Sequence, residues 1–355
     1  MGTQPARVVV WATGWIGQIA IRSVARRPDL ELVGVWVHSP EKVGEDGGRL
    51  AGIDPIGVLA TDDVDALLAL RPDCVVYAAH GPERDAAAVP AYARILRAGV
   101  NVVTTSSPSL VYPPGFDPAF TAELRAAAEE GGVTLYGSGI EPGFAADHLP
   151  LLLCTQSDRI TSIHSTEIFL YDGYPGVFDM RDVMGFGMPL DYEPLLATPG
   201  APTLAWGPSI QLIADALGVE VEGTREVYDR VPSDRRLEVA SGVIEPGTCG
   251  AMRIQTIGIV NGRDAITIEH VNRMAADLGP DWATAARDGT YRVEIKGDPD
   301  ISCDMAVGDP AAPTAGGMTV TAMRVVNAIH AVVAAPPGLV SSLDLPLTLP
   351  SDAFS

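Results

Sequence analysis

The chain has 355 residues, of which 47% are hydrophobic, enough for two domains with substantial cores. Its formal net charge of −21 argues against nucleic acid or an anionic membrane as a partner, because both would repel it. No run reaches the roughly 18 uninterrupted apolar residues of a membrane span, and the N-terminal residues lack the pattern of a signal peptide. We therefore expect a cytoplasmic protein with a small-molecule substrate.

The cysteines are far apart in the sequence and form neither a CxxC pair nor a cluster with zinc-ligand spacing. No metal site is therefore predicted, and four buried, reduced thiols are expected: Cys74, Cys154, Cys249 and Cys303.

The stretch from residue 7 to residue 20 reads RVVVWATGWIGQIA, which predicts a strand, a tight turn and the opening of a helix. In such a turn, backbone N–H groups approach a pyrophosphate, and the helix N-terminus adds partial positive charge. Against the pattern G-x-G-x-x-G, Ala12 stands at the first glycine and Ala20 at the third-glycine position. The alternative is an ordinary strand-to-helix turn. The residues predicted to hold a dinucleotide here are Thr13, Gly14, Trp15, Ile16 and Gly17.

Strands and helices then alternate regularly up to about residue 140. Short apolar strands between helices indicate a parallel sheet covered on both faces, typical of a Rossmann-type domain, here residues 1–145. The predicted strands are 30–37, 73–79, 101–105 and 133–137, and the predicted helices are 61–70, capped by Thr61 or Asp62, 84–98 and 116–130.

Longer strand patterns follow, which predict a second, α+β domain on a mixed or antiparallel sheet over residues 146–312. Asn261-Gly262 is a two-residue hairpin signal between two of its strands. The region 313–355 contains an apolar helix, 316–334, expected to pack back against the first domain, and an extended tail. The predicted strands are 160–170, 222–231, 237–244, 251–260, 265–274, 290–295 and 301–307, with helices over 145–156, interrupted at Pro150, near 181–186, and over 209–217.

Several segments together resemble the dihydrodipicolinate-reductase-like proteins that include 2,4-diaminopentanoate dehydrogenase and the native amine dehydrogenases. The resemblance implies an NAD(P)H-dependent, dimeric, two-domain enzyme whose active site between the domains passes hydride to an imine carbon. Dihydrodipicolinate reductase itself is less favoured, because its paired histidines and lysine are missing from STEIFLYDGYPG at 165–176. The segments are VWATGWIG (10–17), LVGVWVHSPEKVGEDG (32–47), VNVVTTS (100–106), GIEPGFAADHL (139–149), VMGFG (183–187) and AMRVVNAIHAVVAAPPG (322–338).

Cofactor choice is expected to depend on the end of the second strand, where NAD-binding proteins usually place an acid. Here His38 and Ser39 stand instead, followed by Lys42, one of only two lysines. A hydroxyl and a cation suit a 2′-phosphate, and His38 can flank the adenine, so NADP is favoured and NAD stays possible. A solvated loop is the alternative.

Other strand ends supply further predicted cofactor contacts. Ala79 and His80 follow the third strand, where they either touch the cofactor or begin the next turn. Thr104 and Ser106 follow the fourth strand, on the side where parallel strands face the nicotinamide ribose. The resemblance adds Asn327, on the last helix.

An acid expected from the resemblance is missing. Amine dehydrogenases of this group carry a glutamate for proton transfer in the region where this chain has Ser106 and Ser107. Glu141, after the fifth strand, could take its place, or could cap the following helix. Glu167, within a predicted strand, is expected on the solvent face.

The pocket is predicted from the second domain. The resemblance places aromatic side chains such as Tyr171 and Tyr174 there, and either could protonate a carbonyl oxygen or simply pack. Strand alternation puts His270 on the same face as Ile266 and Ile268, where it is a core histidine or a proton donor. The predicted catalytic set is Glu141, Tyr171 and His270, and the predicted pocket residues are Ser107, Phe144, Tyr174, Met184 and Phe186.

These features predict hydride transfer to a C=N or C=O carbon of a small apolar substrate. A cofactor-binding regulatory protein without turnover is the alternative from another class, and the missing glutamate would suit it.

Overall fold

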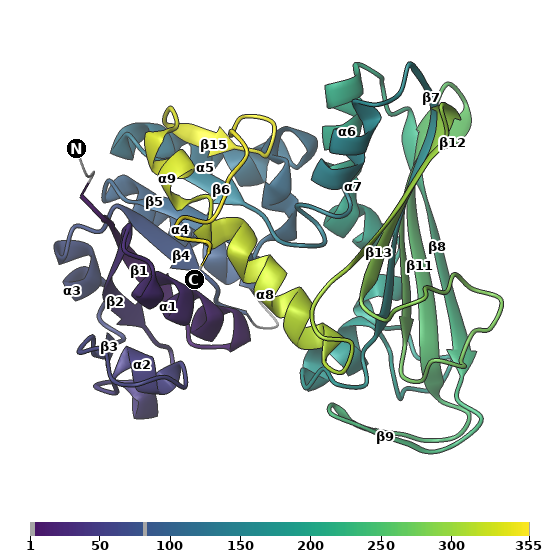
Figure 1. The fold of residues 1–355 in the computed structure, drawn as a ribbon, viewed down its shortest axis with the longest axis horizontal. Coiled ribbons are helices and arrows are strands. Elements are labelled where there is room, and N and C mark those ends of the chain that lie inside the picture. Colours follow the sequence, from purple (N-terminus) through teal and green to yellow (C-terminus); the bar gives the residue numbers. More distant parts are fainter. Residues whose placement is uncertain (1–3, 81–83, 355) are drawn as a thin grey trace. The chain divides into compact units, whose positions relative to one another are not determined.

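The computed structural model describes residues 4–80 and 84–354 (Figure 1). The chain divides into two compact units. Unit 1 comprises Met1–Gly139 and Met318–Ser355, and unit 2 comprises Ile140–Gly317. The predicted fold class is confirmed: unit 1 contains a parallel sheet, and unit 2 contains a mixed sheet with helices.

The sheet of unit 1 has seven strands in the order β15-β6-β5-β4-β1-β2-β3, all parallel. Its central strands are apolar on both faces, because Val8 and Val10 belong to one core cluster and Val9 to another. The strands are Ala6–Trp11 (β1), Leu30–Trp36 (β2), Ala60–Thr61 (β3), Cys74–Tyr77 (β4), Asn101–Thr104 (β5), Thr134–Gly137 (β6) and Gly338–Val340 (β15).

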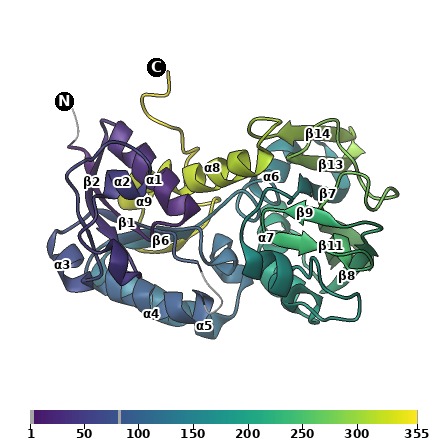
Figure 2. The same cartoon turned by 90° about the horizontal axis from the view of Figure 1, so that it is seen from below.

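Helices cover both faces of this sheet (Figure 2). Side chains of α1 and α9 contribute to the core on one face, and those of α4 and α5 to the core on the other. The helices are Trp15–Arg26 (α1), Gly47–Leu50 (α2), Val64–Ala69 (α3), Arg84–Arg97 (α4), Pro118–Gly131 (α5), Pro313–Val326 (α8, which crosses the boundary between the units) and Ile329–Ala334 (α9).

Three expectations for unit 1 are wrong in detail. The cap of α3 is Asp63, whose carboxylate accepts from the Ala66 N–H, because Thr61 already belongs to β3. The helix predicted over 316–334 is broken between α8 and α9, where the Ala328 N–H bonds three residues back to Val325. The tail is not merely extended, because β15 adds a parallel strand beside β6.

The segment Pro313–Ala334 is long and apolar enough to cross a membrane by length and composition alone. Buried core helices pass the same test. Five of its side chains lie in the core of unit 1, namely Val325, Val326, Ala328, Ile329 and Val332. We therefore treat it as a packed helical segment.

The sheet of unit 2 has six strands in the order β14-β13-β7-β12-β11-β8, in which β7 and β12 are parallel and the other neighbours antiparallel. The predicted hairpin is confirmed: Asn261 (φ +52°) and Gly262 (φ +68°) join β11 to β12. The elements are His148–Cys154 (α6), Arg159–Leu170 (β7), Ala201–Leu217 (α7), Gly223–Pro232 (β8), Leu237–Val239 (β9), Gly242–Ile244 (β10), Cys249–Val260 (β11), Arg263–Arg273 (β12), Thr290–Asp298 (β13) and Ile301–Ala306 (β14).

Unit 2 also corrects several expectations. The strand predicted over 237–244 is a hairpin of β9 and β10, since Gly242 has φ +133°. Pro150 does not interrupt α6, because it is the third residue of the helix, where its missing N–H has no helical partner to lose. Cys303 is only partly buried, unlike the other three cysteines.

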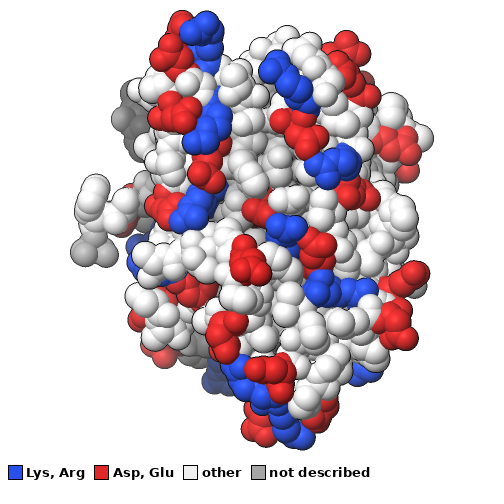
Figure 3. Space-filling model, turned by 90° about the vertical axis from the view of Figure 1, so that its right-hand side faces the viewer, with Lys and Arg blue, Asp and Glu red and all other residues white. Residues whose placement is uncertain are grey.

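Charges of both signs lie interspersed on the face shown in Figure 3, despite the net charge of the chain. Ion pairs also join neighbouring strands of unit 2, as in Arg253–Asp229 between β11 and β8, at 2.5 Å, and Arg292–Asp304 between β13 and β14, at 2.7 Å. An alternating surface of this kind offers no extended basic patch to a polyanion.

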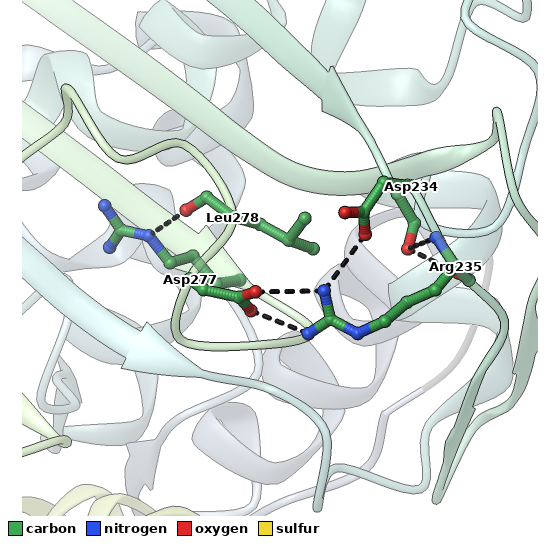
Figure 4. A network of polar contacts seen from close by, with 6 residues as sticks. Asp234, Arg235, Asp277 and Leu278 are labelled. Carbon is green, nitrogen blue, oxygen red and sulfur yellow. Dashed lines mark hydrogen bonds and ion pairs between the residues drawn. The ribbon is translucent and has the colours of Figure 1, made fainter.

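The loop after β12 is held by a buried arginine (Figure 4). Arg273, 4% exposed, donates from Nε to the Leu278 carbonyl at 2.7 Å and from Nη2 to two further carbonyls, those of Gly279 and Ala283. Nearby, Arg235 makes two hydrogen bonds to the Asp277 carboxylate, at 2.7 and 2.9 Å, but its side chain is 44% exposed.

The substitution Arg273→Met is expected to lower the free energy of unfolding by about 2–4 kcal/mol, since it leaves three carbonyls without their donor. The matched variant Arg235→Met breaks only exposed ion pairs, with Asp234 and Asp277, and is expected to cost much less. Urea unfolding of both variants measures the difference, and equal costs would contradict the role assigned to Arg273.

Candidate functional site

The glycine turn between β1 and α1 has an open backbone at the helix N-terminus. A Cβ added at Gly14 would meet nothing within 4 Å, whereas a Cβ at Gly17 would lie 1.9 Å from the Ala12 carbonyl oxygen. Gly17 is therefore the glycine of close helix packing, and the expectation that Ala20 takes the third-glycine position is wrong. The free space at Gly14 fits the approach of a pyrophosphate to the N-terminus of α1.

The loop after β2 lies against this turn. Lys42 Nζ donates to Thr13 Oγ1 at 3.2 Å, so two predicted cofactor residues meet although they are 29 positions apart in the sequence. Ser39 begins the short 3₁₀ helix that carries Lys42, and His38 is exposed beside it. The structure therefore places a cation, a hydroxyl and an imidazole together at the end of β2.

The predicted residues after β5 are buried. Thr104 Oγ1 and Ser107 Oγ lie 2.8 and 3.1 Å from the hydroxyl of buried Tyr92, and Thr104 also accepts from the Ser106 N–H. The hydroxyls of Thr104 and Ser107 thus hold the loop to α4. After β4, Ala79 is half-buried and His80 exposed.

Asn327 is not brought to the glycine turn. Its Oδ1 accepts from Nη1 of Arg27, the residue that follows the last turn of α1, at 2.8 Å. A helix as long as α1 places that end about 18 Å from its N-terminus.

The predicted catalytic residues of unit 2 meet around Glu167. His270, Glu167 and Tyr291 are direct neighbours across β12, β7 and β13. Glu167 Oε1 accepts from the Tyr171 hydroxyl at 3.1 Å and from Asn272 Nδ2 at 2.9 Å, and lies 3.4 Å from His270 Nδ1.

The expectation that Glu167 faces solvent is wrong, since it is only 5% exposed. The period-2 pattern contained the signal, because Glu167 has the same parity as buried Ile163 on β7. The prediction that Glu167 faces solvent followed its residue type, because a carboxylate is rarely buried without partners. The partners of Glu167 lie in other segments of the chain. Asn272 has the same parity as His270 and was missed for the same reason.

Glu141 is the second buried carboxyl group of this cluster. Its side chain is 3% exposed, and Oε1 lies 3.7 Å from His270 Nε2, too far for a hydrogen bond. Among the described residues, neither Glu141 oxygen nor His270 Nε2 has a hydrogen-bond partner. The imidazole itself packs on Trp206 of α7, with ring centroids 4.3 Å apart. Buried, unpartnered atoms aimed at one another mark a place where a ligand can supply the missing contacts.

The two carboxyl groups have pKa values displaced in opposite directions. Burial, followed by the charges of Glu167 and Asp147, raises the pKa of Glu141 well above its usual range. Burial also disfavours the charge on Glu167, but hydrogen bonds and charge from His270, with hydrogen bonds from Asn272 and Tyr171, lower its pKa overall. These opposite shifts favour the protonated form of Glu141 and the anionic form of Glu167.

The Tyr171 hydroxyl donates a hydrogen bond to the carboxylate of Glu167. Burial, and then the negative charge of Glu167, raise the pKa of its hydroxyl well above the usual value. The proton therefore stays on the oxygen, from which it is donated to Glu167.

The predicted pocket residues occupy varied environments. Tyr174 packs edge-on against Tyr171 and donates to Asp179 at 3.0 Å, Phe144 stacks on His148, and Met184 is half-buried. Phe186 is 3% exposed and belongs to the core of unit 2.

In the described part of the chain, no group of three His, Cys, Asp or Glu residues could hold a metal ion.

Comparison with known proteins finds two family profiles in the chain. Residues 7–109 match the profile "Dihydrodipicolinate reductase, N-terminus", and residues 203–352 match "2,4-diaminopentanoate dehydrogenase C-terminal domain". An amine dehydrogenase from Streptomyces virginiae is 42% identical over 344 residues, which are 96% of each chain. A 2,4-diaminopentanoate dehydrogenase from Acetoanaerobium sticklandii is 26% identical over 71% of this chain and 68% of its own.

A solved structure shares the fold. The amine dehydrogenase from Mycobacterium smegmatis superposes with a TM-score of 0.79 over 97% of both chains, at 22% identity. The resemblance seen in the sequence is thus confirmed over nearly the full length. The chain belongs to the amine dehydrogenase family, a group of NAD(P)H-dependent oxidoreductases whose nucleotide-binding half is related to that of dihydrodipicolinate reductase.

Proposed function

We propose that this enzyme reduces the C=N bond of a small, mostly apolar imine or iminium and catalyses the reverse oxidation of the amine, with Glu141 as the proton donor and acceptor. The observation that carries the proposal is the buried Glu141 carboxyl group, unpartnered among the described residues and 3.7 Å from His270. In this proposal Glu141 takes the role of the acid that the sequence lacks at Ser106 and Ser107. A bound nicotinamide cofactor supplies or accepts the hydride.

The charge of the cluster favours a C=N over a C=O substrate. Glu167 is anionic, no Lys or Arg of the described chain forms an ion pair with it or with Glu141, and Asn272 Oδ1 also lacks a donor. A protonated Glu141 can donate to an imine nitrogen or to a carbonyl oxygen, so the preference rests on the Glu167 anion and on Asn272 Oδ1, both of which favour an N–H-bearing cation. The Tyr171 hydroxyl already donates a hydrogen bond to Glu167, so it is not available to protonate a carbonyl oxygen.

The test is NADPH oxidation with a panel of small ketones and aldehydes, each with and without ammonia. We expect turnover only when ammonia is present. Equal turnover without ammonia would replace this proposal by carbonyl reduction, and no turnover over the whole panel, despite cofactor binding, would favour a non-catalytic NADP-binding protein.

We also propose NADP as the preferred cofactor, on the strength of Lys42 beside the glycine turn. The substitution Lys42→Ala is expected to raise the KM for NADPH about tenfold, because one charge-assisted contact to a 2′-phosphate is worth about 1.4 kcal/mol, and to leave the KM for NADH nearly unchanged. Lys296→Ala is the matched control, since Lys296 is the other lysine and pairs with Asp300 on the surface. A wild-type preference for NADH would contradict the proposal.

We further propose a homodimer formed through the sheet of unit 2, supported by its long strands and by the family resemblance. Sedimentation at micromolar concentration is expected to show a dimer, and a monomer would refute this arrangement.

A further inference from the structure

We propose that Glu167 is a positioning residue that fixes the orientation and tautomer of His270, so that His270 Nε2 exchanges a proton with the Glu141 carboxyl group. The inference deepens the proposed function and rests on it for its catalytic meaning. Its structural content, the state of one imidazole ring, can be tested without any substrate.

The ring is held from one side by Glu167 and from its face by Trp206. Glu167 Oε1 faces Nδ1 at 3.4 Å and is itself held by Tyr171 and Asn272. A carboxylate accepts hydrogen bonds, so the neutral imidazole carries its proton on Nδ1. Nε2 is then an acceptor, and it is the ring atom that faces Glu141 Oε1 at 3.7 Å.

A balanced proton exchange follows from this geometry. When Glu141 gives up its proton, the O–H bond breaks and an N–H bond forms at His270 Nε2, leaving a carboxylate and an imidazolium. The imidazolium then lies between two carboxylates, which accept from its two N–H groups. The return transfer restores both neutral groups, and no oxidant or reductant takes part. A closure of a few tenths of an ångström brings the two atoms within hydrogen-bond distance.

The surroundings restrict the ring to this exchange. The titratable groups around it are Glu167 on β7, Tyr291 on β13, Tyr171 after β7, and Glu141 with Asp147 before α6. Asp147 is engaged elsewhere, because it accepts from the N–H groups of Gly143 and His148 and from the Ser209 hydroxyl at 2.6 Å. Burial, and then Glu167, raise the pKa of Tyr291 well above its usual value, so it stays protonated.

Nitrogen NMR of the imidazole rings in the full-length protein tests the tautomer directly. The chain has six histidines, and His270→Asn assigns the signal. At a pH where the ring is neutral, we expect the Nδ1–H tautomer in the wild type. In Glu167→Gln, an amide N–H can point at Nδ1 and favour the Nε2–H form instead. An Nε2–H ring in the wild type, or a ring unaffected by Glu167→Gln, would overturn the proposal.

A buried glutamate on the opposite face of the same sheet provides the matched control. Glu269 is 6% exposed and accepts from His164 at 3.0 Å, Thr166 at 3.1 Å and Gln255 at 2.8 Å. Glu269→Gln removes a comparable charge, so it is expected to change the His164 signal and leave His270 and turnover as they are.

Kinetics connect the ring to the reaction. Glu167→Gln is expected to lower kcat about 10- to 100-fold, the scale of a misplaced catalytic group, and to change the pH dependence of kcat. Loss of stability alone, without a change in the pH profile, would mean a structural role and would overturn the proposal. If Glu167→Gln changes the tautomer of His270 but the wild type turns over no imine, the proposed function fails and the tautomer assignment stands. If Glu141→Gln abolishes turnover and Glu167→Gln does not, the relay alone fails.

Discussion

Replacing Glu141 by glutamine is expected to lower kcat for ammonia-dependent ketone reduction by about 10²- to 10⁴-fold, the usual contribution of a general acid and base. The amide keeps the shape of the side chain but can neither release a proton to the substrate nor take one from it. Initial rates with saturating NADPH measure the loss. An unchanged kcat would show that the proton comes from another group.

The pH dependence of the wild type should follow the same residue. Because burial and the charges of Glu167 and Asp147 raise its pKa, Glu141 is protonated above the normal carboxyl range. In the reductive direction the protonated form is the donor, so kcat falls as the pH rises through the raised pKa. In amine oxidation the carboxylate is the acceptor, so kcat rises over the same interval. Both the fall of kcat in reduction and its rise in amine oxidation are expected to disappear in Glu141→Gln.

Stability separates a catalytic loss from unfolding. A carboxyl group whose pKa is higher in the folded than in the unfolded state favours folding below the unfolded value, about 4.3, and this contribution is lost as the pH rises through the folded value. Glutamine removes the cost of burying the charge. We therefore expect Glu141→Gln to have a Tm at neutral and alkaline pH at least as high as that of the wild type, and a large fall in Tm would make the kinetic result uninformative.

Substituting Gly17 by alanine is expected to raise the Kd for NADPH about 100-fold, because displacement of a binding group by about 1 Å has effects of that size. The added Cβ would lie 1.9 Å from the Ala12 carbonyl oxygen and 2.8 Å from its carbonyl carbon, and both atoms belong to the backbone. The turn and the N-terminus of α1 must therefore separate, which moves the N–H groups that meet the pyrophosphate. Fluorescence titration with NADPH measures the loss, and urea unfolding is expected to show a destabilisation of about 1–3 kcal/mol.

Gly14→Ala is the matched control at the same turn. Gly14 has φ −72°, which alanine adopts freely, and its Cβ would enter open space. Because Gly14 is the N-cap of α1 and alanine is a poorer N-cap than glycine, the fold is expected to lose up to about 1 kcal/mol, whereas NADPH binding weakens because the methyl group occupies the space that the pyrophosphate needs. Wild-type affinity in both variants would show that the cofactor does not use this turn.

Local patterns predicted most of the secondary structure. The alternation of short apolar strands with helices was sufficient for the parallel sheet of unit 1, and Asn261-Gly262 for the hairpin of unit 2, since both depend on neighbouring residues. The same alternation put His270 on the face of Ile266 and Ile268, and the structure confirms it through the contacts with Trp206 and Glu167. The third glycine was misassigned although the spacing of G-x-G-x-x-G from Ala12 already gives Gly17, where the structure shows the close approach to the Ala12 carbonyl.

The sequence by itself determined the family, the glycine turn after β1 and the candidate residues Glu141, Tyr171 and His270, because motifs and strand periodicity are local properties. Only the tertiary structure decided that these three residues meet around Glu167. A buried carboxylate is tolerated where hydrogen-bond donors compensate for its desolvation. Those donors come from segments up to 105 residues apart, so the strand alternation could place Glu167 on the buried face but could not place it among these donors.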